Sequence, residues 1–281
     1  MTVPFSFEVY PPRKPELQAA LHATIQALAA AGPEFITVTY GANGSSRDAS
    51  LDCLRFIREN TFIEPLAHLT CVGTSRAEIT AVVDSFIDAG IHMFLALRGD
   101  PPEGTEATSD YLGELSSASE LVELISERGG DRVTVSVAAF PNGHPQSSTP
   151  QQDVEVLLAK QRAGAEFAIT QLFFEANDYL TFAAAAADAG VTIPILPGIM
   201  PVTSLGRLRR IVEITGERMP VELEAALEAA GTPAEARELG VTHAVELCRA
   251  LVAGGAPGLH LYAFNEHETV LDVLAQVNQP A

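Results

Sequence analysis

Short apolar runs alternate with longer stretches in which apolar residues recur every three to four positions, and this alternation extends along the whole chain. The first run, Phe5–Tyr10, is apolar at almost every position except Ser6 and Glu8, and Pro11 and Pro12 follow it. Proline has no N–H to donate to a neighbouring strand, so the pair ends the run. A nearly continuous apolar run is typical of a strand in a parallel sheet that is covered on both faces.

Seven further apolar runs follow, and helical stretches separate them. The other predicted strands are Phe35–Tyr40, Pro65–Val72, His92–Leu97, Val133–Phe140, Phe167–Phe174, Ile193–Ile199 and Gly258–Phe264. The predicted helices are Pro15–Ala31, Ser50–Asn60, Arg76–Ala89, Ala118–Arg128, Gln152–Ala163, Asp178–Ala189, Ser204–Thr215, Met219–Gly231, Pro233–Ala253 and Thr269–Val277.

Eight strands that alternate with helices predict an α/β fold, a (β/α)8 TIM barrel that occupies residues 1–281 as a single domain. Two extra helices stand before the last strand. The alternative is a doubly wound open sheet, but no GxGxxG sequence follows the first strand, which weighs against it.

Composition narrows the class of protein. Hydrophobic residues make up 47% of the 281 residues and charged residues 19%, as in a well-packed soluble enzyme. The net charge of −19 argues against binding to nucleic acid or to anionic membranes. Cys53, Cys71 and Cys248 are scattered and lack metal-ligand spacing, so we expect neither a zinc site nor a disulfide framework. The N-terminus has no signal-peptide pattern and no apolar run could span a bilayer, which predicts a cytoplasmic protein.

Polar residues gather at the carboxyl ends of the predicted strands, where a barrel of this kind carries its active site. In strand order they are Glu8; Thr39, Tyr40 and Asn43; His68 and Thr70; Arg98 and Asp100; Phe140 and His144; Thr170 and Gln171; Tyr262 and Asn265. Polar loops that begin where strands end would explain Asn43 and His144. They do not explain Glu8 or Gln171, which have apolar residues on both sides.

Each of these residues also has a structural explanation. A lone carboxylate in an apolar strand is costly unless it is paired, protonated or used in chemistry, and Glu8 could simply be bound by an arginine or a backbone amide. His68 alternates with Leu66 and Thr70, which favours a hydrogen-bonded core histidine. Arg98-Gly99-Asp100 could be a surface turn, and Lys160 would by default be a solvated charge. No Ser-His-Asp order is present, so acyl transfer has no support.

Nine short sequence strings, in order from the first strand to the last, resemble the bacterial-type methylenetetrahydrofolate reductases. They are Ser6–Arg13, Val38–Asn43, His68–Cys71, Leu97–Asp100, Val137–Pro141 with His144-Pro145, Lys160 with Ala163–Ala165, Ala168–Gln171 with Phe173-Phe174, Pro197–Val202, and His260–Tyr262 with Asn265. The resemblance implies a (β/α)8 barrel that reduces 5,10-methylenetetrahydrofolate to 5-methyltetrahydrofolate with NADH or NADPH through bound FAD, in one-carbon metabolism and methionine biosynthesis.

The resemblance also implies a role for individual residues. Glu8 looks like the general acid that protonates N10 of the folate, which requires a pKa raised toward ~6–7. Asp100 resembles the catalytic aspartate beside the flavin that also meets the pterin, and Gln171 resembles the amide that hydrogen-bonds the pterin. Thr39 and Ile211 match substrate-binding positions. The positions that match FAD-binding residues are Thr39, His68, Arg98, Gly99, Asp100, Ala118, Phe140, His144, Asp153 and Lys160. No metal is implied.

The chain departs from the family's pattern around the cofactor. Val156 and Ala159 stand where relatives often have an asparagine and an arginine, Phe140 where a tyrosine is common, and Ser117 where an aromatic residue often stands. A flavin-independent reductase, with direct hydride transfer from the nicotinamide to the folate, is therefore an alternative. Others are a non-catalytic relative that binds folate or flavin, and a barrel flavoenzyme that acts on proline. The choice between NADH and NADPH and the oligomeric state, including a homo-oligomer, stay open.

Overall fold

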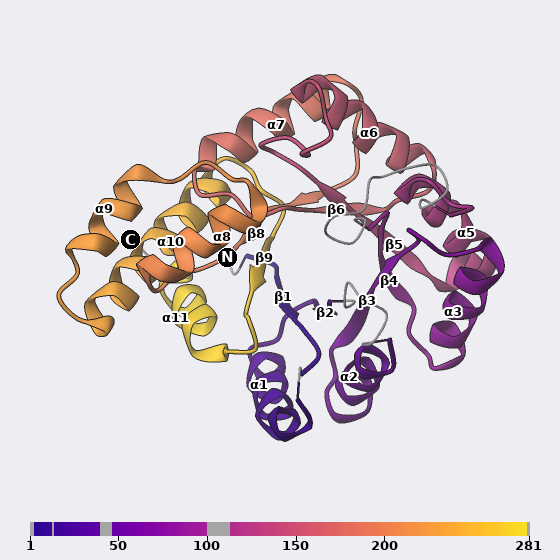
Figure 1. Cartoon of the computed structure of the whole chain (residues 1–281), viewed down its shortest axis with the longest axis horizontal. Helices are drawn as coiled ribbons and strands as arrows, with labels where there is room; N and C mark the ends of the chain where they lie inside the picture. Colours follow the sequence, from indigo (N-terminus) through magenta and orange to yellow (C-terminus); the bar gives the residue numbers. More distant parts are fainter. Residues whose placement is uncertain (1–2, 13, 40–46, 100–112, 280–281) are drawn as a thin grey trace.

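Parallel strands form a barrel at the centre of the computed structural model, which describes residues 3–12, 14–39, 47–99 and 113–279 (Figure 1). The strands are β1 (Phe5–Val9), β2 (Phe35–Val38), β3 (Glu64–Thr70), β4 (Met93–Leu97), β5 (Thr134–Ala139), β6 (Phe167–Thr170), β7 (Ile195–Leu196), β8 (Gly198–Ile199) and β9 (Leu259–Tyr262). Their order is β7-β6-β5-β4-β3-β2-β1-β9-β8, and each strand pairs in parallel with its neighbours in this order.

The predicted seventh strand is divided at Pro197 into β7 and β8. Strand β7 pairs with β6 and β8 pairs with β9, so this one segment joins the two ends of the sheet. Pro197 cannot donate a ladder hydrogen bond, but its carbonyl oxygen accepts one from the His260 N–H at 2.9 Å. The predicted TIM barrel is therefore confirmed, with its seventh strand interrupted by proline.

Helices surround the strands (Figure 1). They are a 3₁₀ turn (Pro15–Leu17) followed by α1 (Gln18–Ala30), α2 (Arg47–Asn60), α3 (Arg76–Asp88), α5 (Ala118–Gly129) with a 3₁₀ turn (Gly130–Arg132), α6 (Pro150–Arg162), α7 (Ala176–Asp188), α8 (Leu205–Thr215), α9 (Val221–Ala229), α10 (Pro233–Ala253) and α11 (His267–Val277). Helices α9 and α10 are the two extra helices predicted before the last strand. No helix among the described residues is long and apolar enough to cross a membrane.

Local sequence explains where several helices begin. Helices α3, α5 and α10 each start with a capping box, in which a Ser or Thr hydroxyl accepts from the N–H three residues on and a Glu carboxylate returns to the cap. In α5 the cap is Ser117, whose hydroxyl accepts from the Glu120 N–H. The departure at position 117 thus has a structural role, which is to start α5.

The strands separate two apolar regions. Phe7 and Val9 of β1 point outward into the main core between strands and helices, and neither is exposed to solvent. Inside the barrel, Phe35, Leu66, Leu95 and Ile169 form a smaller apolar cluster. Because side chains alternate along a strand, Ser6 and Glu8 face this interior. The three cysteines are buried and free.

Candidate active site

Glu8 lies in β1, and its two neighbouring strands supply the residues around it. In the strand register Glu8 is opposite Thr37 of β2 and Tyr262 of β9. Its side chain is 19% exposed and enters the barrel interior near the carboxyl ends of the strands. The position is where a (β/α)8 barrel places its catalytic groups.

Four side chains contact the Glu8 carboxylate. The Thr39 hydroxyl donates to Oε1 at 3.0 Å, and the Thr37 hydroxyl donates to Oε2 at 3.4 Å. The Nε2 atoms of His68 and His260 lie 3.6 and 3.5 Å from Oε2. We call Glu8, Thr37, Thr39, His68 and His260 the Glu8 cluster. Both histidines are almost completely buried, at 6% and 0% exposure, so the carboxylate and the two rings meet with little water between them.

The electrostatics of this cluster correct one expectation. Burial raises the pKa of Glu8, but the nearby imidazoles of His68 and His260 and the Thr39 hydroxyl together outweigh burial and leave the pKa below its ordinary value. We predicted a raised pKa because the role of general acid requires one and because an apolar strand would favour it by desolvation. That prediction was wrong because two histidines from other strands stabilise the carboxylate. Burial lowers the pKa of His68, and the nearby carboxylate only partly opposes it.

Three members of this environment were not predicted as site residues: Thr37, His260 and Ser6. Ser6 Oγ lies 2.8 Å from Nδ1 of His260, so the hydroxyl fixes the ring that faces Glu8. The sequence contained a pattern that could have identified Ser6 and His260. Ser6 and Glu8 are two residues apart on one strand, as are His260 and Tyr262 on another, so each pair must share a strand face.

Gln171 and Tyr262 are arranged around the end of β6. The Gln171 side-chain oxygen accepts from the Leu172 N–H at 2.9 Å, so the amino group is the end that can donate to a ligand. The Tyr262 hydroxyl donates to the Thr170 carbonyl at 2.9 Å. Burial and the Glu8 charge raise the pKa of Tyr262 well above its usual value, so the phenol remains protonated. Ile211 is 8% exposed and packs in an apolar cluster with Leu172, Phe174 and Met200 under α8.

The residues predicted to bind FAD that we describe next lie after β4 and β5. The Arg98 Nη1 donates to Gln146 Oε1 at 2.6 Å, and its Nε donates to the Gly99 carbonyl at 3.2 Å. Asp153 on α6 is 6% exposed; its Oδ1 accepts from the His144 N–H at 3.1 Å and from Ser147 Oγ at 2.8 Å. Its Oδ2 is buried without a hydrogen bond from any described residue. Asp153 therefore fixes the loop that carries His144.

Lys160 on α6 is buried, not solvated. Its ammonium donates to the Ala138 carbonyl at 2.7 Å and lies 5.8 Å from the centre of the Phe140 ring. Burial lowers the pKa of Lys160 to about 8, with Asp153 acting in the opposite direction. Ala118, the first residue of α5, is 8% exposed. Asp100, Tyr40 and Asn43 lie outside the described residues, so their predicted roles stay predictions.

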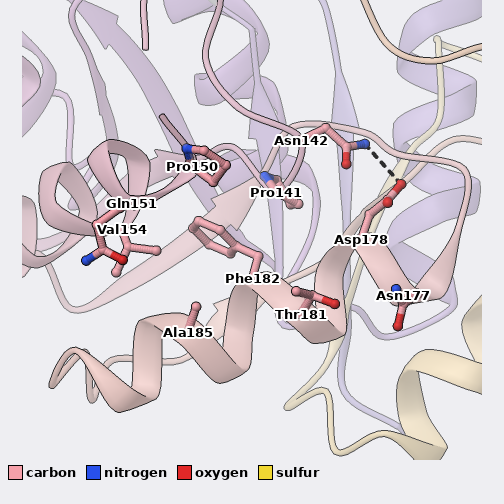
Figure 2. Close-up of a pocket in the computed structure, with 10 residues that line it drawn as sticks. All are labelled: Pro141, Asn142, Pro150, Gln151, Val154, Asn177, Asp178, Thr181, Phe182 and Ala185. Atoms are coloured by element: carbon pink, nitrogen blue, oxygen red, sulfur yellow. Dashed lines mark hydrogen bonds between the residues drawn. The ribbon is translucent and has the colours of Figure 1, made fainter. Parts of the chain in front are cut away.

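A pocket of about 310 Å³ lies apart from the Glu8 cluster, between the first turns of α6 and α7 (Figure 2). Pro141, Pro150 and Phe182 give it apolar walls, and Asn142 at its edge donates to Asp178 at 3.0 Å. None of the predicted catalytic or binding residues lines it. We therefore assign the candidate active site to the barrel mouth and not to this pocket. The described residues contain no cluster of metal ligands.

Comparison with known proteins identifies the relatives of this chain. Residues 2–278 match the family model described as methylenetetrahydrofolate reductase. The 5,10-methylenetetrahydrofolate reductase of Salmonella typhimurium is 35% identical over 264 residues, covering 94% of this chain and 86% of that protein. Methylenetetrahydrofolate reductase (NADH) 1 of Arabidopsis thaliana is 33% identical over 280 residues, covering 96% of this chain and 47% of that protein.

A solved structure supports the fold independently. An uncharacterized protein from Clostridium thermocellum, described as binding two copies of 5-methyl-5,6,7,8-tetrahydrofolic acid, superposes with a TM-score of 0.67. The alignment covers 98% of this chain and 94% of that one at 14% sequence identity, so it bears on the fold alone.

Proposed function

The chain belongs to the methylenetetrahydrofolate reductase family of oxidoreductases, and we propose that it reduces 5,10-methylenetetrahydrofolate to 5-methyltetrahydrofolate with NADH or NADPH. The observation that carries the proposal is the Glu8 cluster. A carboxyl group is held between two buried imidazoles at the mouth of a barrel, an arrangement suited to a reaction that needs a proton at that point.

The reaction needs one proton and one hydride at different atoms. Glu8 delivers a proton to N10 of the folate, the bond between N10 and the bridging carbon breaks, and a cationic iminium forms at N5. Hydride then adds to the bridging carbon, which becomes the methyl group. Gln171 is suited to hold the pterin, because its amide amino group is the end that can donate.

The proton supply has to be consistent with the lowered pKa of Glu8. The Nε2 atom of His68 lies 3.6 Å from the carboxylate, so the protonation of Glu8 is coupled to that of His68. A folate that covers the mouth displaces water and thereby disfavours the carboxylate relative to the neutral acid. We infer that Glu8 takes up its proton when folate covers the mouth.

The route of the hydride is the second part of the proposal. Bound FAD would supply a hydride carrier, and the residues after β4 and β5 are those that would have to hold its pyrophosphate. The residues after β4 and β5 fit the FAD pyrophosphate poorly. Lys160 donates inward to Ala138, and Val156, 42% exposed, and Ala159 form the outer surface of α6. Segment 100–112 contains four acidic residues, Asp100, Glu103, Glu106 and Asp110, and neither Lys nor Arg. We therefore infer that hydride passes directly from the nicotinamide to the folate.

The test is a purified protein assayed for folate-dependent NADH and NADPH oxidation, with 5-methyltetrahydrofolate identified as the product by chromatography. Flavin is measured by absorbance after denaturation, and the assay is repeated with added FAD. Turnover without flavin supports both parts of the proposal. Turnover that requires FAD supports the reaction and overturns direct transfer. Folate binding without turnover overturns the reaction itself.

A further inference from the structure

The hydrogen-bond ladder of the barrel is interrupted between β6 and β8. Strand β6 pairs with β7 as far as Ile169, which is opposite Leu196. Strand β8 begins at Gly198 and pairs with β9 instead. The break therefore lies between Thr170 and Gly198, and both residues are buried. Buried backbone N–H and C=O groups need hydrogen-bond partners, so the groups at this break must find them outside the ladder.

Two side chains supply these partners. The Gly198 N–H donates to the Thr170 hydroxyl oxygen at 2.8 Å, and the Tyr262 hydroxyl donates to the Thr170 carbonyl at 2.9 Å. Thr170 is 1% exposed, so little water is present to replace either bond. One residue of β6 thus accepts from β8 through its side chain and from β9 through its backbone. We call Thr170, Gly198 and Tyr262 the β6 clasp.

The Tyr262 ring crosses over Gly198 to reach β6, and only glycine leaves room for it. A Cβ at position 198 would lie 2.9 Å from the Tyr262 hydroxyl oxygen and would overlap the Thr170 carbonyl oxygen. Real Cβ atoms do not approach other atoms so closely, so a side chain at this position would push the ring off Thr170. The missing side chain at Gly198 is therefore what allows the phenol to span the break.

The β6 clasp is in contact with both halves of the candidate site. On β9, Tyr262 is opposite Glu8 in the register, and its ring meets the His260 ring edge-on with centres 5.3 Å apart. The Nε2 of His260 in turn lies 3.5 Å from the Glu8 carboxylate. On β6, Thr170 directly precedes Gln171, the amide proposed to hold the pterin. The bond from Tyr262 to Thr170 thus connects the proposed acid to the pterin-holding amide across the break.

We propose that Thr170 is a positioning residue for folate reduction: it holds Tyr262 across the break and thereby fixes Gln171 on β6 relative to Glu8 on β1. The inference rests on the proposed function, because it requires that Gln171 and Glu8 act on the same folate. Gln171 holds the pterin while Glu8 delivers a proton to N10, so the spacing between the two strands sets the distance of the proton transfer. A misplacement of about 1 Å costs on the order of 10²-fold in rate.

The experiment measures kcat for folate reduction in the wild-type protein, in Thr170→Val, Thr170→Ser and Tyr262→Phe, and in the double variant Thr170→Val/Tyr262→Phe. Assays run at a temperature at which circular dichroism shows every variant to be folded. We expect Thr170→Val and Tyr262→Phe each to lower kcat roughly 10-fold, about the effect of one hydrogen bond. Thr170→Ser keeps the hydroxyl and should retain most of the wild-type kcat. Thr134→Val is the matched control and should change nothing, because Thr134 is on a barrel strand but at the first position of β5.

The double variant separates positioning from stability. If the β6 clasp acts as one unit, kcat of the double variant falls no further than that of the slower single variant. Losses that multiply to about 100-fold, or a Thr170→Ser protein as slow as Thr170→Val, overturn the positioning role and leave the reaction intact.

Tyr262→Phe keeps the ring and removes only the hydroxyl, so it decides the question even if Thr170→Val does not fold. An unchanged kcat in Tyr262→Phe overturns the inference. A wild-type protein without folate turnover overturns the proposed function and this inference with it.

Discussion

The imidazole of His260 connects Ser6 to Glu8: its Nδ1 lies 2.8 Å from Ser6 Oγ and its Nε2 lies 3.5 Å from Glu8 Oε2. The ring is completely buried, and it belongs to β9, which is the neighbour of β1 in the sheet. One side chain on β1 thus orients a histidine of the adjacent strand toward a second side chain on β1. The proposed acid is held by the barrel wall itself, and no loop is needed to place it.

Replacement of Glu8 by glutamine should remove the proton donor while keeping the size of the side chain. We expect kcat for folate reduction to fall roughly 10²- to 10⁴-fold, the range found for general acids. Steady-state kinetics with purified protein measure the effect. Glu64→Gln is the matched control, because Glu64 is also on a barrel strand but lies at the exposed first position of β3. A Glu8→Gln protein with unchanged kcat would exclude Glu8 as the acid.

The Ser6 hydroxyl should act through His260, and its loss should move the pH profile. In Ser6→Ala the ring loses the partner of Nδ1, so we expect kcat to fall about 3- to 10-fold, which corresponds to one hydrogen bond. A purely structural loss would lower the amount of folded protein but leave the shape of the kcat–pH curve unchanged. A shift of that curve in Ser6→Ala, with no further shift when His260→Asn is added, would support the positioning role. Independent shifts would contradict it.

Lys160 should make the protein less stable at neutral pH than it would be with an apolar residue there. Its pKa in the folded protein is about 8, below its ordinary value of 10.5, so folding disfavours the charged form. The unfolded chain binds the proton between these values; stability therefore rises as pH increases from about 8 to 10.5, and the whole penalty is present below pH 8.

We expect Lys160→Met to increase the free energy of unfolding by the order of 1–2 kcal/mol at pH 7, after the lost bond to Ala138 is subtracted. The gain should vanish above pH 10.5. Thermal melts at pH 7 and pH 10.5 measure it. Lys14→Met is the control, because Lys14 is exposed and is the other lysine of the chain. A gain that is equal at both pH values would mean that charge burial is not its source.

Gly240 should tolerate no side chain, because α10 packs its backbone directly on the loop after β8. A Cβ at this position would overlap the carbonyl oxygen of Val202. We expect Gly240→Ala to lower the free energy of unfolding by more than ~3 kcal/mol. Gly206→Ala, in helix α8, meets no atom within 4 Å and should be neutral or stabilising by about 0.5–1 kcal/mol. Chemical denaturation of the two variants tests the contrast. Similar effects in both would contradict the packing.

The alternation of strand and helix patterns was sufficient to predict the barrel. The positions of Glu8, Gln171 and His68 at strand ends led us to predict that the site lies at the mouth. The hydrophobic pattern could not predict the interruption at Pro197. The effect of one proline within an apolar run depends on which strands pair with the segments before and after it, and these are β6 and β9. The pattern also assigned Lys160 to solvent by default, whereas α6 places that ammonium against the barrel wall.

The sequence by itself determined that a carboxylate would lie inside a parallel barrel, because the period of two residues along β1 puts Ser6 and Glu8 on the face opposite Phe7 and Val9. Only the tertiary structure decided the direction in which the pKa of that carboxylate shifts. Barrel closure brings β9 beside β1, so Ser6 and His260 meet although 254 residues separate them. The pKa of Glu8 depends on the charges that surround it in space, and those come from strands whose register no local pattern specifies.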